Sequence, residues 1–240
     1  MTLLWFVPGV LVFGFSLLLF APPAWLLRWI QRRSGVVFHW DAPRPILYLT
    51  IDDAPSPFSH HILNALDECN QSKALFFVIG RLALNHPSVL KRILAEGHQV
   101  GNHDLDNRVT AAPWHPHVAD FNAVKQILVK AAAAAAAPQQ LTSWLRPGCG
   151  FYTTKVLEAA AATQHRVLLG DVYGHDCQFV WFPRFLQWFY LWRIRSSDGN
   201  VVILHDGTER RARNTAAVIK LLFRNGYSFR LLPTNPSILA

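Results

Sequence analysis

The chain has 240 residues, enough for one domain of about 200 residues with a full core and a short appendage. Hydrophobic residues make up 51% and charged residues only 16%, a departure from soluble averages that indicates a membrane segment. The net charge of +8 is scattered and no nucleic-acid-binding signature accompanies it, so we expect no nucleic-acid partner. The 3 cysteines form neither a disulfide framework nor a zinc-finger spacing.

The chain begins with an apolar stretch. Residues 3–27 carry no formal charge, and about 20 apolar residues suffice to cross a bilayer. A basic and aromatic flank follows, formed by Trp25, Arg28, Trp29, Arg32 and Arg33. We therefore predict that residues 1–38 are an uncleaved transmembrane anchor with its connector, ahead of a folded domain at 39–240. A cleaved signal peptide and a buried core helix are the alternatives, and residues 1–5 lack the base with which a signal peptide begins.

This anchor predicts a single-pass membrane protein, whose orientation the sequence leaves open. The arginines follow the span, so the positive-inside rule favours a cytoplasmic domain. An enzyme that acts on a glycan outside the cytoplasm needs the opposite orientation.

Strand and helix patterns alternate through the folded part. Short apolar runs predict strands over 46–51, 74–79, 98–102, 144–146, 166–170, 201–205 and 229–232. Apolar residues at helical spacing predict helices over 60–69, 87–96, 118–137 and 215–225. The alternation is typical of an α/β fold with a largely parallel sheet, either open or closed into a barrel. In such folds the chemistry collects at the carboxyl ends of the strands.

Two adjacent carboxylates follow the first predicted strand. Asp52 and Asp53 come directly after residues 47–51, and Ala54-Pro55 turns the chain away. Neighbouring carboxylates repel each other unless a cation or a shared proton separates their roles, so one can bind a metal while the other serves as a base. Taken alone, the pair is explained at least as well by an acidic loop or a helix cap.

Two histidines at other strand ends are candidate partners for this pair. His103 follows the strand 98–102, and an imidazole beside a carboxylate suits zinc or another first-row divalent ion. His205 ends the apolar strand 201–205, where it is well placed as a general acid. A solitary histidine is more often structural, but several strand ends with catalytic residue types favour one shared site.

Two more strand ends have polar residues of interest. Arg146, in the turn 146–150, could hold a carboxylate, and the glycines of that turn let backbone N–H groups approach an oxyanion. A plain surface turn explains this segment about as well. Asp171 and Asp176 follow the strand 166–170, and either could orient a histidine.

Together these motifs resemble those of the NodB-homology polysaccharide deacetylases, also called carbohydrate esterase family four. Residues 50–55 (TIDDAP) are similar to the family's T-F-D-D-G-P, and residues 96–103 (EGHQVGNH) to its E-G-H-E-x-G-N-H. Three further segments are similar to F-F-V-x-G, R-P-x-x-G and L-H-D, namely 76–80, 146–150 and 204–207. The resemblance implies a distorted (β/α) barrel that removes acetyl groups from an amino-sugar polymer or oligomer, such as chitin or peptidoglycan.

The resemblance also implies catalytic roles. Asp52 corresponds to the general base, and Arg146 holds it in place. His205 corresponds to the acid that protonates the leaving amine, and Asp176 orients it. The backbone N–H of Cys149 corresponds to the oxyanion donor.

A divalent metal, commonly zinc, is the implied cofactor. Asp53 and His103 correspond to two of its ligands, and Asn107 stands where the family has a second histidine or an aspartate. An amide binds zinc more weakly than imidazole or carboxylate does, and Asp104 or Asp106 are possible substitutes. The alternative function is therefore a catalytically impaired, glycan-binding membrane protein with a deacetylase-like fold.

Two other departures from the family pattern matter for the site. Ala54 replaces a glycine, which is mild unless the backbone there needs a positive φ. The family's sugar-lining Trp is absent from residues 171–176.

The segment 179–192 is rich in Trp and Phe. Core packing is the preferred interpretation of this segment, and a second membrane contact is the alternative.

Overall fold

The computed structural model describes residues 21–106, 108–110, 112 and 117–233. Most of the predicted transmembrane stretch lies outside these residues, and so does Asn107. Within the described ranges, no helix combines the length and the apolar character needed to cross a bilayer. The predicted anchor and the domain boundary near residue 38 therefore stay predictions.

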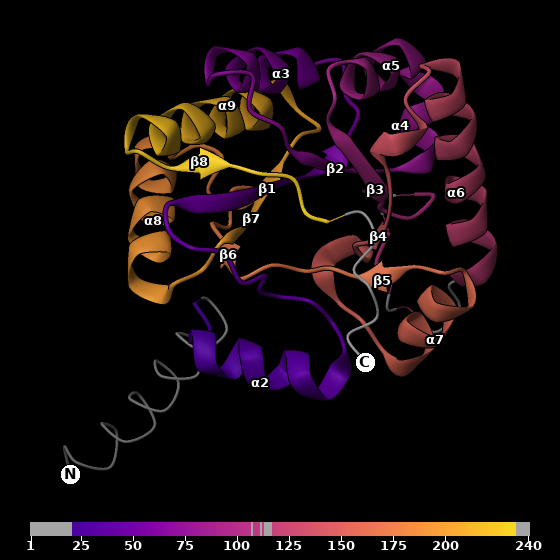
Figure 1. Ribbon diagram of the computed structural model, residues 1–240, viewed down its shortest axis with the longest axis horizontal. Helices are drawn as coiled ribbons and strands as arrows, with labels where there is room; N and C mark the ends of the chain where they lie inside the picture. The colour runs from indigo at the N-terminus through magenta and orange to yellow at the C-terminus, as the bar shows by residue number, and fades with distance from the viewer. Residues whose placement is uncertain (1–20, 107, 111, 113–116, 234–240) are drawn as a thin grey trace.

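In the described part of the chain, parallel strands form one curled sheet (Figure 1). The strands are β1 (Ile46–Ala54), β2 (Leu75–Val78), β3 (Gln99–Asn102), β4 (Leu141–Leu145), β5 (Arg166–Val167), β6 (Val172–Tyr173), β7 (Val201–His205) and β8 (Ser228–Phe229). Their order is β5–β4–β3–β2–β1–β7–β6, and β8 pairs with β1. Because β6 follows β5 along the chain yet lies at the other end of this order, the sheet curls round on itself. The structure confirms the predicted α/β class and parallel sheet, as a distorted and incompletely closed barrel.

Helices surround the sheet (Figure 1). They are α2 (Ala24–Ser34), α3 (Ser59–Glu68), α4 (Gly80–Asn85), α5 (Pro87–Ala95), α6 (His117–Ala134), α7 (Thr154–Ala162), α8 (Pro183–Ser197) and α9 (Glu209–Arg224), with 3₁₀ turns at η1 (Pro138–Gln140) and η2 (Gly148–Gly150). Helix α9 begins six residues before the predicted 215. Its first turns are polar, so the apolar pattern misses them, but the side chain of Thr208 caps the true start.

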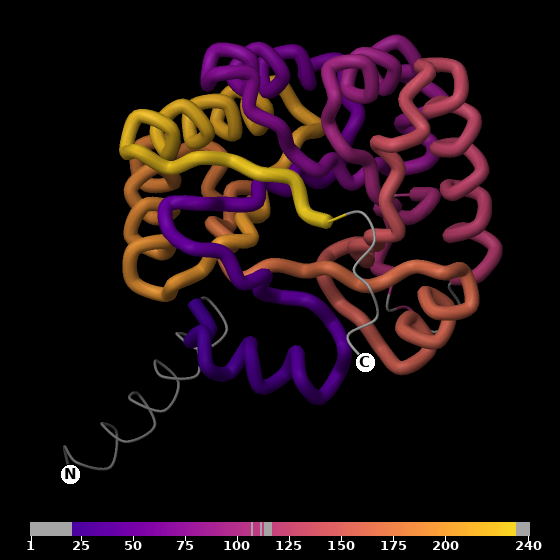
Figure 2. Tube along the Cα trace, in the orientation of Figure 1, coloured from indigo at the N-terminus to yellow at the C-terminus, as the bar shows by residue number. Residues whose placement is uncertain are grey.

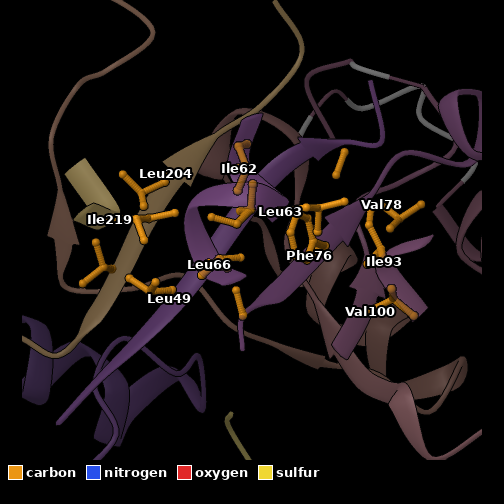
Figure 3. Close-up of a cluster of buried hydrophobic side chains, with 14 of the residues drawn as sticks. Leu49, Ile62, Leu63, Leu66, Phe76, Val78, Ile93, Val100, Leu204 and Ile219 are labelled. Carbon is orange, nitrogen blue, oxygen red and sulfur yellow. The ribbon is translucent and has the colours of Figure 1, made fainter. Parts of the chain in front are cut away.

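The two faces of β1 have different neighbours. Leu49 and Ile51 pack outward, and their buried cluster includes the helical residues Ile62, Leu63, Leu66 and Ile219 (Figure 3). Tyr48 belongs to a second cluster inside the barrel, with Leu75, Phe77, Trp144 and Val201. Since side chains alternate along a strand, Thr50 and Asp52 share the inward face of Tyr48. The apolar outer face of β1 therefore directs Asp52 toward the barrel interior.

The preferred interpretation of residues 179–192 as a core segment is wrong for most of its aromatic side chains. Helix α8 buries an inner face that includes Leu186, Phe189 and Tyr190. Its outward side exposes Trp181, Phe182, Phe185, Trp188 and Trp192. The helix is amphipathic, but aromatic rings occupy the solvent side where polar residues are usual.

The described end of the predicted span and the residues just after it pack on the domain. In α2, Leu27 and Ile30 join a buried cluster with Leu145 and Val156. Val37 then forms a parallel bridge with Leu168, beyond the end of β5.

Candidate active site

The carboxyl edge of the sheet collects the predicted site residues. They are Asp52 and Asp53 at the end of β1, His103 after β3, Arg146 after β4, and His205 at the end of β7. Strands β1 and β7 are paired so that Asp52 lies opposite His205. Residues separated by up to 153 positions in sequence thus meet because parallel neighbours end at one edge.

A buried arginine holds Asp52. Arg146, which is 2% exposed, places Nη1 2.6 Å from Asp52 Oδ1 and 2.8 Å from Thr50 Oγ1. Its remaining N–H groups donate to two backbone carbonyls, those of Leu168 and Leu169. Such a bonded ion pair fixes the direction of the Asp52 carboxylate and keeps one of its oxygens, Oδ2, out of the Arg146 contact.

Asp53 faces a different pair of side chains. Its φ of 60° is uncommon outside glycine and turns the side chain out of the β1 alternation. Asp53 Oδ1 lies 3.7 Å from His103 Nε2, and Asp53 Oδ2 lies 3.4 Å from Arg211 Nη1. His103 Nδ1 donates to the Arg146 carbonyl at 2.7 Å, which leaves Nε2 as the nitrogen that faces Asp53.

Burial and charge oppose each other in this pair. Burial alone raises the pKa of Asp53, but the hydrogen bond and charge of His103 outweigh it, so the pKa lies below its usual value. Burial alone lowers the pKa of His103, but the carboxylates of Asp52 and Asp53 raise it above its usual value. The two shifts together favour an ionised Asp53 next to a positive charge at His103.

His205 lies between two carboxylates. Its Nδ1 donates to Asp176 Oδ1 at 2.8 Å, and its backbone N–H donates to Asp176 Oδ2 at 2.9 Å. Its Nε2 lies 3.9 Å from Asp52 Oδ2. Burial lowers the pKa of His205, but the charge and hydrogen bond of Asp176, with help from Cys177, raise it well above 6.5. This histidine is therefore poised to hold a proton.

Two groups of described residues have donors suited to a divalent ion. The 3.7 Å between Asp53 Oδ1 and His103 Nε2 fits two ligands of one ion with bonds of about 2 Å. The predicted third ligand, Asn107, lies outside the described residues. The second group is Asp176, Cys177 and His205, whose donor atoms lie within 4.8 Å of one another.

The two acidic substitutes for Asn107 have other partners. Asp104 accepts from Thr110 Oγ1 at 2.9 Å. Asp106 pairs with Arg81 and with Arg108. Neither joins Asp53 and His103 in a three-residue ligand group among the described residues.

The contacts bear on two sequence-based expectations, the orienting role of Asp176 and the replacement of the family's glycine by Ala54. Asp171 bonds to His39 at 2.6 Å and accepts from the backbone of Val201, so Asp176 alone of the two aspartates contacts His205. The positive φ falls on Asp53 and not on Ala54, so replacing the family's glycine by Ala54 costs nothing there.

Three residues of this edge had no predicted role. Arg211 contacts Asp53, and Cys177 contributes to the electrostatics of His205. Asp206 accepts from the hydroxyls of Ser56 and Ser59, while its N–H donates to the Asp52 carbonyl at 2.9 Å. Asp206 is the last residue of the L-H-D motif, and this position in the sequence could have indicated its role at the site.

Residues 40–168, more than half of the chain, match the polysaccharide deacetylase family. The chain belongs to this family. It is thus a hydrolase of carbon–nitrogen bonds other than peptide bonds, as the resemblance predicted. A chitooligosaccharide deacetylase of Rhizobium leguminosarum bv. phaseoli is 37% identical over 170 residues, which cover 68% of this chain and 69% of that protein.

Solved structures share the fold. A peptidoglycan N-acetylglucosamine deacetylase superposes with a TM-score of 0.71 at 24% identity, over 85% of this chain and 94% of that one. A pseudoenzyme of carbohydrate esterase family four from Bacillus anthracis superposes with a TM-score of 0.67 at 20% identity, over 80% of this chain and 65% of that one. The fold is thus shared by an active deacetylase and a pseudoenzyme, so the roles of individual residues are argued from side-chain chemistry and not from the fold.

Proposed function

We propose that the protein removes N-acetyl groups from an amino-sugar polymer or oligomer of the chitin or peptidoglycan type, with a divalent ion, zinc, as cofactor. The observation that carries the proposal is the convergence of Asp52, Asp53, His103 and His205 at one strand edge. The names of the relatives, chitooligosaccharide and peptidoglycan deacetylases, support the substrate class.

On this proposal Asp52 is the general base. Arg146 holds its Oδ1, so Oδ2 accepts a proton from the attacking water while the hydroxyl oxygen bonds to the acetyl carbon. Arg146 keeps the carboxylate in place before the attack.

His205 is the general acid. Asp176 binds Nδ1, which directs the Nε2 proton toward the side where Asp52 lies. When the carbon–nitrogen bond breaks, this proton passes to the leaving nitrogen, so the products are acetate and a free amine. The raised pKa of His205 keeps that proton on the ring at neutral pH.

Asp53 and His103 would hold the metal, with Asn107 as the predicted third ligand. A divalent ion bound there supplies a Lewis acid for the acetyl carbonyl. The proposal also includes attachment to a membrane through residues 1–38, supported by the uncharged stretch 3–27.

The test is acetate release by the full chain from chitin oligomers and peptidoglycan fragments in the presence of zinc or cobalt. Asp52→Asn and His205→Ala should each lower the rate by about a hundred-fold or more. Asp67→Asn, on the exposed side of α3, is the matched control and should keep the rate. Full acetate release by either site variant would refute the assigned roles.

The alternative function is glycan binding by a site that has lost its metal, because Asn107 replaces a stronger ligand. The complete set of partners around Asp52 and His205 argues against it. Metal analysis of the gently purified chain separates the two. A stoichiometric divalent ion that is lost in His103→Ala supports the enzyme, and a metal-free chain that still binds chitin oligomers supports the alternative.

A further inference from the structure

The outward side of α8 carries a continuous aromatic stripe. Trp181, Phe185, Trp188 and Trp192 are 67%, 38%, 58% and 41% exposed. They follow one another at intervals of four, three and four residues, which places them on one side of the segment that leads into and forms α8. Large aromatic side chains exposed side by side are rare on a soluble surface and mark a contact region.

Along α8, the rings of Phe185, Trp188 and Trp192 contact one another in turn. The rings of Phe185 and Trp188 have centroids 5.8 Å apart, and those of Trp188 and Trp192 stack at 6.1 Å with 11° between their planes. The guanidinium of Arg210 lies over the Trp181 ring, 3.8 Å from the ring centroid. The stripe is therefore one surface and not a set of scattered side chains.

The helices that carry the exposed rings have only basic residues among their charged side chains, although Asp198 follows α8 directly and pairs with Arg44. Helix α8 contains no Asp or Glu, and its Arg184 and Arg195 are exposed. Helix α2 also lacks acidic residues, and its last turn contains Arg32 and Arg33. A basic surface with exposed aromatic rings complements anionic headgroups above an apolar layer.

Helix α2 repeats this pattern close by. Its Trp25 and Trp29 are 69% and 51% exposed and lie one turn apart. The guanidinium of Arg193, from α8, donates to the carbonyl of Pro22, so α2 begins beside α8. Figure 2 shows that the described chain starts next to these two helices. The described end of the uncharged stretch, residues 21–27, therefore meets the domain beside α8.

We propose that the stripe Trp181–Phe185–Trp188–Trp192 lies in the headgroup region of an anionic phospholipid bilayer, with Trp25 and Trp29 as a second contact. A sugar chain is the competing occupant, since sugars also stack on aromatic rings. The Phe ring, the absence of acidic side chains on both helices and the adjoining uncharged stretch favour the bilayer.

Such a contact would fix how the active site faces the membrane. Trp181 contacts Arg210, and the next residue, Arg211, contacts Asp53 at the catalytic edge. The stripe therefore runs along α8 from near the site, and its contact would hold the catalytic edge in one orientation to the bilayer. This inference shares only membrane attachment with the proposed function and does not depend on acetate release.

The experiment uses the full chain in nanodiscs of phosphatidylcholine and phosphatidylglycerol whose acyl chains carry bromine close to the headgroups. Bromine quenches tryptophan fluorescence at short range, and the chain has 9 tryptophans. The double variant Trp188→Phe and Trp192→Phe removes two emitters of the stripe and keeps it aromatic. The matched control, Trp144→Phe, removes an emitter buried inside the barrel.

The two variants should change the quenched fraction in opposite directions. Removing Trp188 and Trp192 should lower it, because quenched emitters are lost, whereas Trp144→Phe should raise it. The double variant Arg184→Glu and Arg195→Glu, which reverses two charges, should also lower the quenched fraction in anionic nanodiscs.

A quenched fraction that rises in the double variant, or a chain that does not associate with nanodiscs, overturns the inference. So does loss of the quenching when chitin oligomers are added, because the stripe is then a sugar platform. Acetate release, measured on the same samples, reports on the proposed function separately.

Discussion

His98 and His103 stand at the two ends of β3, and both are buried. At the amino end, burial lowers the pKa of His98 to about 3, and the charges of Lys73 and Arg92 add to the effect. At the carboxyl end, burial acts on His103 in the same direction, but Asp52 and Asp53 reverse it and raise the pKa. Burial is thus common to both residues, and the neighbouring charges decide which imidazole ring can carry a positive charge.

The comparison separates structural from catalytic histidines. His98 Nδ1 accepts from the backbone N–H of Ala74 at 3.3 Å, and its ring lies against Phe76 in a T-shaped contact. These contacts suit a neutral ring in the core. His98 Nε2 lies 3.7 Å from Glu96 Oε2, the same distance as His103 Nε2 from Asp53 Oδ1, so one nearby carboxylate does not distinguish the two rings. Only His103 has the second carboxylate, Asp52, and lies at the edge where the other catalytic groups end. Three variants test whether neighbouring charges, and not burial alone, set the charge state of the buried groups.

The largest effect is expected for Arg146→Met. The guanidinium is the buried counter-charge of Asp52, and its loss leaves a buried carboxylate without compensation. We expect a loss of about 3–5 kcal/mol in the free energy of unfolding and a large fall in acetate release. Urea denaturation followed by fluorescence measures the first effect. Arg213→Met, at an exposed ion pair, should change the unfolding free energy by less than about 1 kcal/mol.

An intermediate effect is expected for Asp176→Asn. Asp176 raises the pKa of His205, so its neutralisation lets the acid lose its proton at a lower pH. The alkaline limb of the pH profile of kcat/KM should therefore move to lower pH. Asp171→Asn is the control, because Asp171 bonds to His39 and not to His205. An alkaline limb that stays in place in Asp176→Asn would show that another group titrates there.

The smallest effect is expected for His98→Phe, and it concerns stability at acid pH. The pKa of His98 is about 3 in the folded chain and ordinarily 6.5 in an unfolded one. Below pH 6.5 the unfolded chain therefore binds a proton at His98 that the folded chain does not bind. His98 should therefore lower the unfolding free energy by about 1.4 kcal/mol for each unit of pH decrease in this window. His98→Phe should remove that slope in urea titrations between about pH 6 and pH 4. His60→Phe, which removes an exposed imidazole, is the matched control.

Much of the site was predictable from the order of residues alone. Asp52 and His205 follow apolar runs that form β1 and β7, and parallel neighbours end at one edge, so their proximity follows from the pattern. The strand pattern left Asp171 and Asp176 as equal candidates for the partner of His205, and only the family resemblance pointed to Asp176. Both follow the predicted strand 166–170, but the structure places β6 between them, and the path of the chain takes Asp171 to His39.

The alternation of strands and helices, the residues at the strand ends and the family follow from local pattern and motif order. The side-chain partners, the opposite pKa shifts of His98 and His103, and the exposure of the aromatic face of α8 follow from the folded chain alone. These properties depend on which groups from distant parts of the chain lie within a few ångströms. Burial and charge are summed over spatial neighbours, which sequence distance does not report.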